Sequence, residues 1–289
     1  MTMKKKWLLY LLFTLVSTAF FIYYLFPADQ IKNYMVFHLN KAHPDINITI
    51  DQIKPAFPPG VWLYDVTIYQ TNDTLLILKQ IKVAPNLLSL FGSKIIFFFK
   101  ANTCDGMIDG KGELAHDTAF KNIHIDATFS DIQISEIHAL RRLNSRNISG
   151  VLAGHVIYSK DPSSGEDIRA MLSISDSEIE LLNPILMLES IAFNIIESDI
   201  VVKNRKIQFK QCSLKGQQMD GSIAGSIILK KPLERSVLKL VGTIRPNPTF
   251  LASLEKDLPK HLIPKKFFSK NGLPIKLSGT IEKPNFLIK

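Results

Sequence analysis

The chain has 289 residues, of which 46% are hydrophobic and 21% are charged, and its formal net charge at pH 7 is +9. This composition excludes an intrinsically disordered chain and a protein with many membrane spans, and ordinary numbers of Gly and Pro exclude a collagen-like or low-complexity scaffold. Two cysteines are too few for a disulfide framework or a structural zinc cluster.

An uncharged apolar run of twenty residues lies near the N-terminus, from Trp7 to Phe26. A helix of that length spans about 30 Å, the thickness of a bilayer core. A cleaved signal peptide is the alternative, but it has a shorter apolar region and a small-x-small cleavage site. The sequence therefore predicts a cytoplasmic tail over 1–6, an uncleaved transmembrane helix over 7–26 and an exported part over 27–289.

Two groups of residues support that topology. Aromatic side chains at both ends of the run are typical of membrane interfaces, and lysines before it place the N-terminus on the cytoplasmic side. The predicted anchor residues are Trp7, Tyr10, Phe20, Tyr23, Tyr24 and Phe26, and the predicted topology signal is Lys4, Lys5 and Lys6.

The exported part begins with helical spacing over 29–43, which Pro44 ends. After Pro44 the apolar residues recur at every second position, most clearly where Ile123, Ile125, Ala127 and Phe129 alternate with polar residues. Alternating runs cover 45–129 and 150–246 and return over 273–282, which predicts about fourteen strands. Short helical patterns fall at 86–91, 135–143 and 249–258, and a helical connector is predicted over 248–270. The predicted fold class is mainly β: an N-terminal transmembrane helix, then a long, curled antiparallel sheet with one apolar face and a few short helices.

A glycine motif repeats inside this pattern, with a hydrophobic residue two positions after the first Gly and a second Gly four positions after it. Residues i and i+4 of a strand lie on the same face, so each copy removes two side chains from one face. We expect these glycines to mark bulges or bends of the sheet. The alternative is that they leave room for a ligand against the backbone. The glycines are Gly106, Gly110, Gly150, Gly154, Gly221 and Gly225.

No catalytic motif, metal-ligand spacing or phosphate-binding loop is present in the sequence, so we expect no cofactor and no enzymatic activity. Cys104 and Cys212 are either a disulfide or two buried small side chains. A lysine-rich segment over 256–270 is either a solvated connector or a contact for anionic lipid or an acidic partner. Nucleic acid is not expected as a partner, because the positive charge is dispersed along the chain.

Two stretches carry a family resemblance. Residues 55–63 read Pro-x-Phe-Pro-x-Gly-x-x-Leu before a strand, and in residues 272–286 an apolar strand with Ser-Gly-Thr ends in Pro-x-Phe. With the predicted anchor and the glycine motifs, the chain resembles the type II secretion system protein N family, in its short form with one N-terminal anchor. That family is itself similar to AsmA-like envelope proteins.

The resemblance implies a single-pass protein of the bacterial inner membrane with its β-rich bulk in the periplasm. Its first implied function is a non-enzymatic component of type II protein secretion that acts through contacts with other envelope or secretion proteins. The alternative implied by AsmA-like proteins is a lipid-binding or lipid-transfer module, in which a curled apolar sheet holds the acyl chains of phospholipid.

Overall fold

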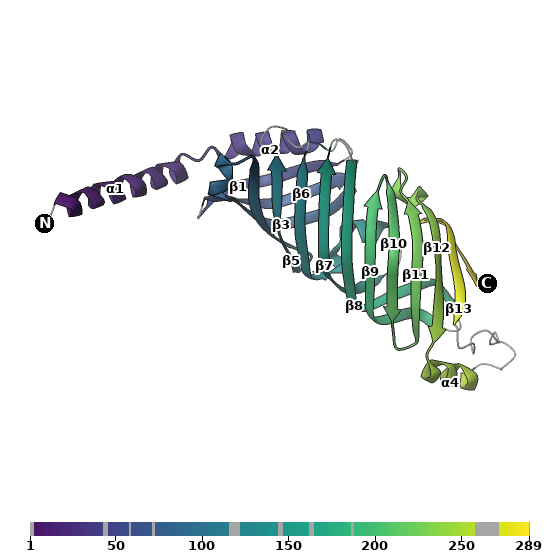
Figure 1. Cartoon of the computed structure of the whole chain (residues 1–289). Helices are drawn as coiled ribbons and strands as arrows, with labels where there is room; N and C mark the ends of the chain where they lie inside the picture. The colour runs from purple at the N-terminus through teal and green to yellow at the C-terminus, as the bar shows by residue number, and fades with distance from the viewer. Residues whose placement is uncertain are drawn as a thin grey trace.

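The computed structural model describes residues 3–42, 46–57, 59–70, 73–115, 122–143, 147–161, 165–185, 188–257 and 272–288. Fourteen strands form a single sheet in which every strand pairs antiparallel with the next strand of the chain (Figure 1). The strands are β1 (Asn47–Ala56), β2 (Gly60–Gln70), β3 (Asp73–Pro85), β4 (Lys94–Thr103), β5 (Gly106–Ala115), β6 (Ile123–Gln133), β7 (Ile148–Asp161), β8 (Gly165–Ile185), β9 (Leu188–Lys203), β10 (Lys206–Lys215), β11 (Met219–Ile228), β12 (Val237–Pro246), β13 (Leu273–Thr280) and β14 (Pro284–Ile288).

The helices lie before the sheet and in its connections. They are α1 (Met3–Tyr24), α2 (Ala28–Ala42), α3 (His138–Leu143) and α4 (Pro248–Asp257), with short 3-10 turns η1 (Leu87–Phe91), η2 (Ile134–Glu136) and η3 (Leu233–Arg235). The helical connector expected over 248–270 begins as α4, and its remainder from 258 to 270 lies outside the described residues.

The predicted fold class needs one correction. The structure is mainly β with one long antiparallel sheet, but a membrane-spanning helix needs about 20 predominantly apolar residues. Within the described ranges, no helix is both long and apolar enough to cross a membrane. This finding overturns the predicted transmembrane helix over 7–26, the single-pass topology and the inner-membrane localisation. The anchor roles given to the aromatic residues of α1, and the topology role of Lys4, Lys5 and Lys6, depended on that helix.

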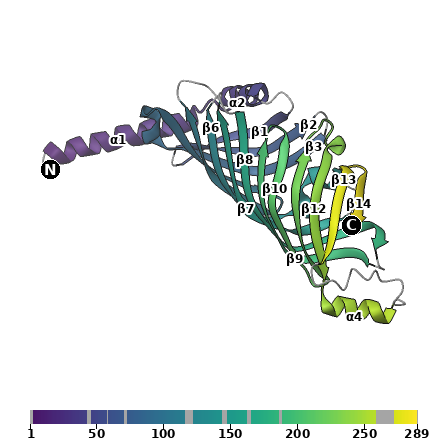
Figure 2. The same ribbon diagram turned by 45° about the vertical axis from the view of Figure 1, so that its right-hand side comes forward.

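The strands bend at a line of irregular positions. Asp65 in β2, Asp131 in β6 and Asp176 in β8 have φ angles of 48°, 58° and 48°, a left-handed conformation that aspartate tolerates better than most residues. Beside Asp131 the register with β7 shifts between Phe129 and Ile132, so residues three apart come to share a face. Bulges of this kind bend a strand and increase its twist. The sheet accordingly curls and turns one face inward (Figures 1 and 2).

Two helices pack against this inward face at opposite ends of the sheet. α2 covers a buried cluster of β1–β4 that includes Ile50, Leu63 and Leu78. Asn40 of α2 also bonds the free edge of β1. Its side chain accepts a hydrogen bond from Ile48 N (2.7 Å) and donates one to Ile48 O (3.2 Å), as a neighbouring strand would. At the other end, Phe250 of α4 packs on a second buried cluster formed by Phe193, Cys212, Leu214 and Met219.

Candidate functional site

The inward face carries a row of apolar residues that crosses the whole sheet. Directly paired residues of antiparallel strands lie on the same face, so the strand registers trace the row from strand to strand. The central apolar row contains one residue of each strand, from β1 to β14: Pro55, Val61, Val83, Phe99, Gly110, Ala127, Val156, Ala170, Ile200, Phe209, Gly225, Leu240, Leu277 and Phe286.

A parallel row lies on each side of the central one. The first flanking row is Ile53, Leu63, Ile81, Ala101, Ile108, Phe129, Gly154, Leu172, Ser198, Cys212, Ile223, Gly242 and Ile275. The second is Pro85, Phe97, Gly112, Ile125, Tyr158, Ile168, Val202, Ile207, Ile227, Leu238, Gly279 and Pro284. The three rows together are called the inner face below.

The inner face holds almost no polar group. In its three rows only Ser198 and Tyr158 carry a side-chain oxygen, and no residue is charged. Beyond Tyr158 and Ile168, at one rim, Lys160 and Glu166 form an ion pair of 3.0 Å. The pKa of Tyr158 is raised to about 12, mainly because the phenol is buried and also because the Glu166 carboxylate is close. This phenol therefore stays neutral. The inner face is therefore both apolar and uncharged across the sheet.

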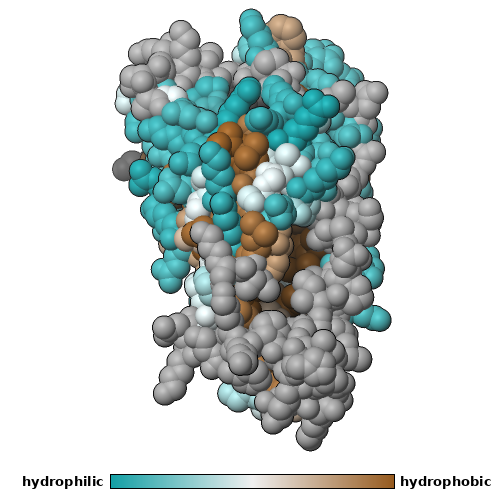
Figure 3. Space-filling view, turned by 90° about the vertical axis from the view of Figure 1, so that its right-hand side faces the viewer, coloured by the Kyte–Doolittle hydropathy of each residue, from teal (hydrophilic) through white to brown (hydrophobic). Residues whose placement is uncertain are grey.

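Among the described residues, protein covers this face only in part. A sheet normally buries its apolar face against a second layer; the described helices α2 and α4 pack on its two ends, and α3 contacts β3. Nine side chains of the three rows are buried, among them Ile53 and Leu240. Val156, Ile200 and Phe209 of the central row are only half-buried. Seen from the β14 end, apolar residues line a hollow between two hydrophilic walls (Figure 3).

The glycines of the repeated motif make room for neighbouring strands. A Cβ on Gly110 would lie 2.7 Å from the Phe99 ring and against the main chain of β6, and one on Gly154 would lie 2.5 Å from Met171 O. Gly150 and Gly225 also have φ of +137° and +129°, which a side chain disfavours. Cβ atoms on Gly106 and Gly221 would likewise meet main-chain oxygens of adjacent strands. The space above these glycines is thus taken by neighbouring strands and rings.

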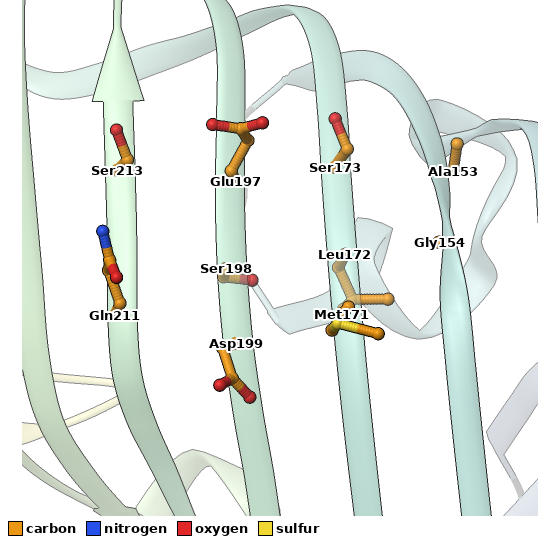
Figure 4. Close-up of a pocket in the computed structure, with 10 residues that line it drawn as sticks. All are labelled: Ala153, Gly154, Met171, Leu172, Ser173, Glu197, Ser198, Asp199, Gln211 and Ser213. Atoms are coloured by element: carbon orange, nitrogen blue, oxygen red, sulfur yellow. The ribbon is translucent and has the colours of Figure 1, made fainter.

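The opposite face of the same strands is polar. Met171, Asp199 and Gln211 are cross-strand partners on β8, β9 and β10, each one residue from an inner-face position. Figure 4 shows a shallow hollow on these strands, lined also by Ser173 and Glu197. Asp199 is neutralised there by Lys210, with a separation of 3.6 Å. The two faces of the sheet therefore offer opposite chemistry.

Two histidines on the polar face contact partners typical of catalytic sites. His155 Nε2 lies 2.6 Å from Asp126 Oδ1, and His124 Nδ1 lies 3.0 Å from Ser159 Oγ. Because the carboxylate and the hydroxyl contact different histidines, these contacts do not form a serine–histidine–aspartate relay. Across the described ranges, no group of three or more His, Cys, Asp or Glu side chains could hold a metal ion.

The two cysteines are free thiols in the structure. Cys104 lies in the turn between β4 and β5, whereas Cys212 lies in β10 on the inner face, six strands away in the sheet. Burial raises the pKa of the Cys212 thiol, which keeps it protonated and unreactive. Of the two alternatives for this pair, the structure shows the one without a disulfide.

Sequence reasoning found the apolar alternation but missed the bend positions, because an aspartate at the polar position of a strand gives no separate signal. Most of the lysine-rich segment over 256–270 lies outside the described residues. No family model, curated protein or solved structure matches the chain. The resemblance to type II secretion and AsmA-like proteins thus stays a prediction.

Proposed function

We propose that this protein is a non-catalytic lipid-binding or lipid-transfer module that holds acyl chains against its inner face. The observation that carries the proposal is the set of three uncharged apolar rows, over which the described helices form no complete second layer. Each Å² of apolar surface that is removed from water contributes about 25 cal/mol of favourable free energy. A ligand that covers the inner face would supply the missing layer.

The lack of polar partners favours an acyl chain over an extended peptide. Each residue of a peptide brings a backbone N–H and a C=O, and leaving one of them unpaired in an apolar site costs about 1–3 kcal/mol. The inner face offers only the side-chain oxygens of Ser198 and Tyr158 to such groups. An acyl chain has no polar group along its length and fits this surface without that cost.

The sheet is long enough to hold an acyl chain at more than one position. Neighbouring strands lie about 4.8 Å apart, so fourteen strands extend for roughly 60 Å. The hydrocarbon core of a bilayer, which holds two opposed acyl chains, is about 30 Å thick. A chain could therefore lie at several positions along the inner face, as transfer along it requires.

A chain-length series tests the proposal. The full chain is titrated with saturated fatty acids of increasing length, below their critical micelle concentrations, against a fluorescent acyl probe. Burial of one CH₂ is worth about 0.8 kcal/mol, so the affinity is expected to rise about fourfold per carbon. An affinity that does not change with chain length would exclude acyl-chain recognition, and displacement by an apolar helical peptide alone would point to a protein ligand.

The other function implied by the resemblance, a type II secretion component acting through protein–protein contact, stays a prediction that rests on the sequence motifs. Its test is the recovery of secretion proteins with the tagged chain after chemical cross-linking.

A further inference from the structure

The connections at one rim of the sheet expose large apolar side chains. η1, between β3 and β4, presents Leu88 and Phe91 with 84% and 93% of their surface exposed. The neighbouring turn between β1 and β2 presents Phe57 with 88% exposed. Leu87 and Leu90 are exposed as well. These five residues are called the rim patch, and their exposure is costly unless another apolar medium covers them.

The rim patch is held in place by hydrogen bonds of its own loop. Asn86 Oδ1 accepts a hydrogen bond from Leu88 N (3.1 Å), and the Ser89 hydroxyl donates to Asn86 O (2.6 Å). Ser89 Oγ also accepts a hydrogen bond from Ile96 N of β4, at 2.9 Å. The backbone of η1 is therefore fixed to the sheet, and the outward direction of its leucines and Phe91 is built into the fold.

A row of cations and an indole ring lies just behind the rim patch, on the polar face. Lys54, Trp62, Lys82 and Lys100 are successive cross-strand partners on β1 to β4. Lys82 Nζ lies 5.3 Å from the centre of the Trp62 ring. Within the described residues, no ion pair neutralises Lys54, Lys82 or Lys100, although Asp109 lies across from Lys100.

The spacing between the row and the patch matches the structure of a bilayer surface. Lys54 and Trp62 lie two residues, and Lys82 three, from the rim ends of their strands, a distance of roughly 7–10 Å. The headgroup layer is about 5–8 Å deep on each side of the hydrocarbon core. Leucine and phenylalanine tips in hydrocarbon, with tryptophan and lysine at headgroup depth, are typical of interfacial binding.

We propose that the rim patch docks this protein on the surface of a bilayer that contains anionic lipid. The apolar tips of Phe57, Leu88 and Phe91 enter the outermost hydrocarbon, while Lys54 and Lys82 contact anionic headgroups. This inference goes beyond acyl-chain binding and does not depend on it. It would bring a bilayer to one rim of the inner face, where Pro85 and Phe97 of the second flanking row lie next to η1.

A built-in fluorophore provides the test. The chain has two tryptophans, Trp7 and Trp62, so the full chain with Trp7→Phe reports on Trp62 alone. It is mixed with vesicles of phosphatidylcholine and phosphatidylglycerol (1:1), or of phosphatidylcholine alone, each with and without brominated acyl chains. We expect bromine to quench Trp62 in the anionic vesicles, and high salt to weaken the effect.

Paired substitutions separate the two parts of the surface. Each lysine near an anionic membrane contributes about fivefold, so Lys54→Gln with Lys82→Gln should weaken partitioning about 30-fold at low salt. Leu88→Ser with Phe91→Ser should weaken it at least tenfold in both vesicle types. The matched control is Val241→Ser, which removes an apolar side chain that is 55% exposed on β12 and should change nothing.

Three outcomes would overturn the proposal that the rim patch docks on a bilayer. They are vesicle binding without quenching of Trp62, equal vesicle affinities of the paired variants and the control variant, and no binding to either type of vesicle. The last would point to a protein partner for the rim patch. Leu172→Glu, an inner-face substitution, should dock normally, so failure of acyl-chain binding and failure of docking remain distinguishable.

Discussion

Leu172 is the position at which acyl-chain binding can be tested most sharply. It lies on the inner face between Gly154 and Ser198, so a ligand at this place gains most of its contact from Leu172. Full burial of a leucine is worth about 1.5–3 kcal/mol. Because Leu172 is already half-buried, about 1 kcal/mol is left for a ligand to gain. Leu172→Ala should therefore weaken fatty-acid binding about fivefold.

Leu172→Glu should have a much larger effect, because an unpaired carboxylate under an acyl chain costs several kcal/mol. We expect at least a hundredfold loss of affinity at pH 7 in the probe-displacement assay. The matched control is Met171→Glu, one residue away on the polar face and 62% exposed, which should bind within twofold of the unaltered protein. Thermal unfolding of each variant is measured to check that the fold is retained. Equal affinities for Leu172→Glu and Met171→Glu would refute the assignment of the inner face.

Three further predictions concern the fold itself. Gly225→Ala should lower the unfolding temperature by at least 4 °C, because the new Cβ meets the main chain of the next strand at a positive φ; an unchanged melting temperature would contradict the observed packing. A thiol reagent should label Cys104 in the folded chain and Cys212 only after unfolding, because Cys212 is buried; two equally fast thiols, or an oxidised pair by mass, would disagree with the structure. The hydrogen bond from Lys111 holds the pKa of Glu113 below its usual 4.5, so its stabilisation is present above that value and lost as the pH falls through the folded-state pKa. Glu113→Gln should thus destabilise by less than about 1 kcal/mol at pH 7 and by less still as the pH falls through the folded-state pKa, and an effect that does not change with pH would exclude this pair as the cause.

The inner face could be predicted from sequence in part. Alternation of Ile123, Ile125, Ala127 and Phe129 with polar residues indicates a strand with one apolar face, and the structure places Ile125, Ala127 and Phe129 on the inner face. Alternation does not give the register between strands. Only the pairing shows that the apolar positions of fourteen strands form continuous rows.

The strand bends and the surroundings of the glycines could be seen only in the three-dimensional structure. Asp131 occupies an ordinary polar position of its strand, and its left-handed conformation becomes visible only in the backbone. In the sequence, Gly110 fits both a bend and a space for a ligand; in the structure, a side chain at this position would meet the Phe99 ring and the main chain of β6. The run from Trp7 to Phe26 predicted a transmembrane helix from length and apolarity, and this prediction was wrong for the described part of the chain.

The rim patch was not predictable, because leucines and phenylalanines in a turn are as often buried as exposed. A helical pattern over 86–91 is present in the sequence, and η1 forms there. Its exposure follows from the hydrogen bonds of Ser89 to Asn86 and Ile96, which fix the loop beyond the last strand residues. Because these contacts depend on how η1 sits beside β4, the sequence alone does not show that its side chains point outward.

Photocross-linking would locate a bound acyl chain on the surface of the sheet. The full chain is incubated with a phospholipid that carries a diazirine near the end of one acyl chain, irradiated, and mapped by peptide mass spectrometry. The account predicts cross-links on inner-face residues such as Phe129, Leu172 and Ile200, and their loss when unlabelled phospholipid is in excess. Cross-links confined to the polar face of β7–β10 or to α1 would contradict it.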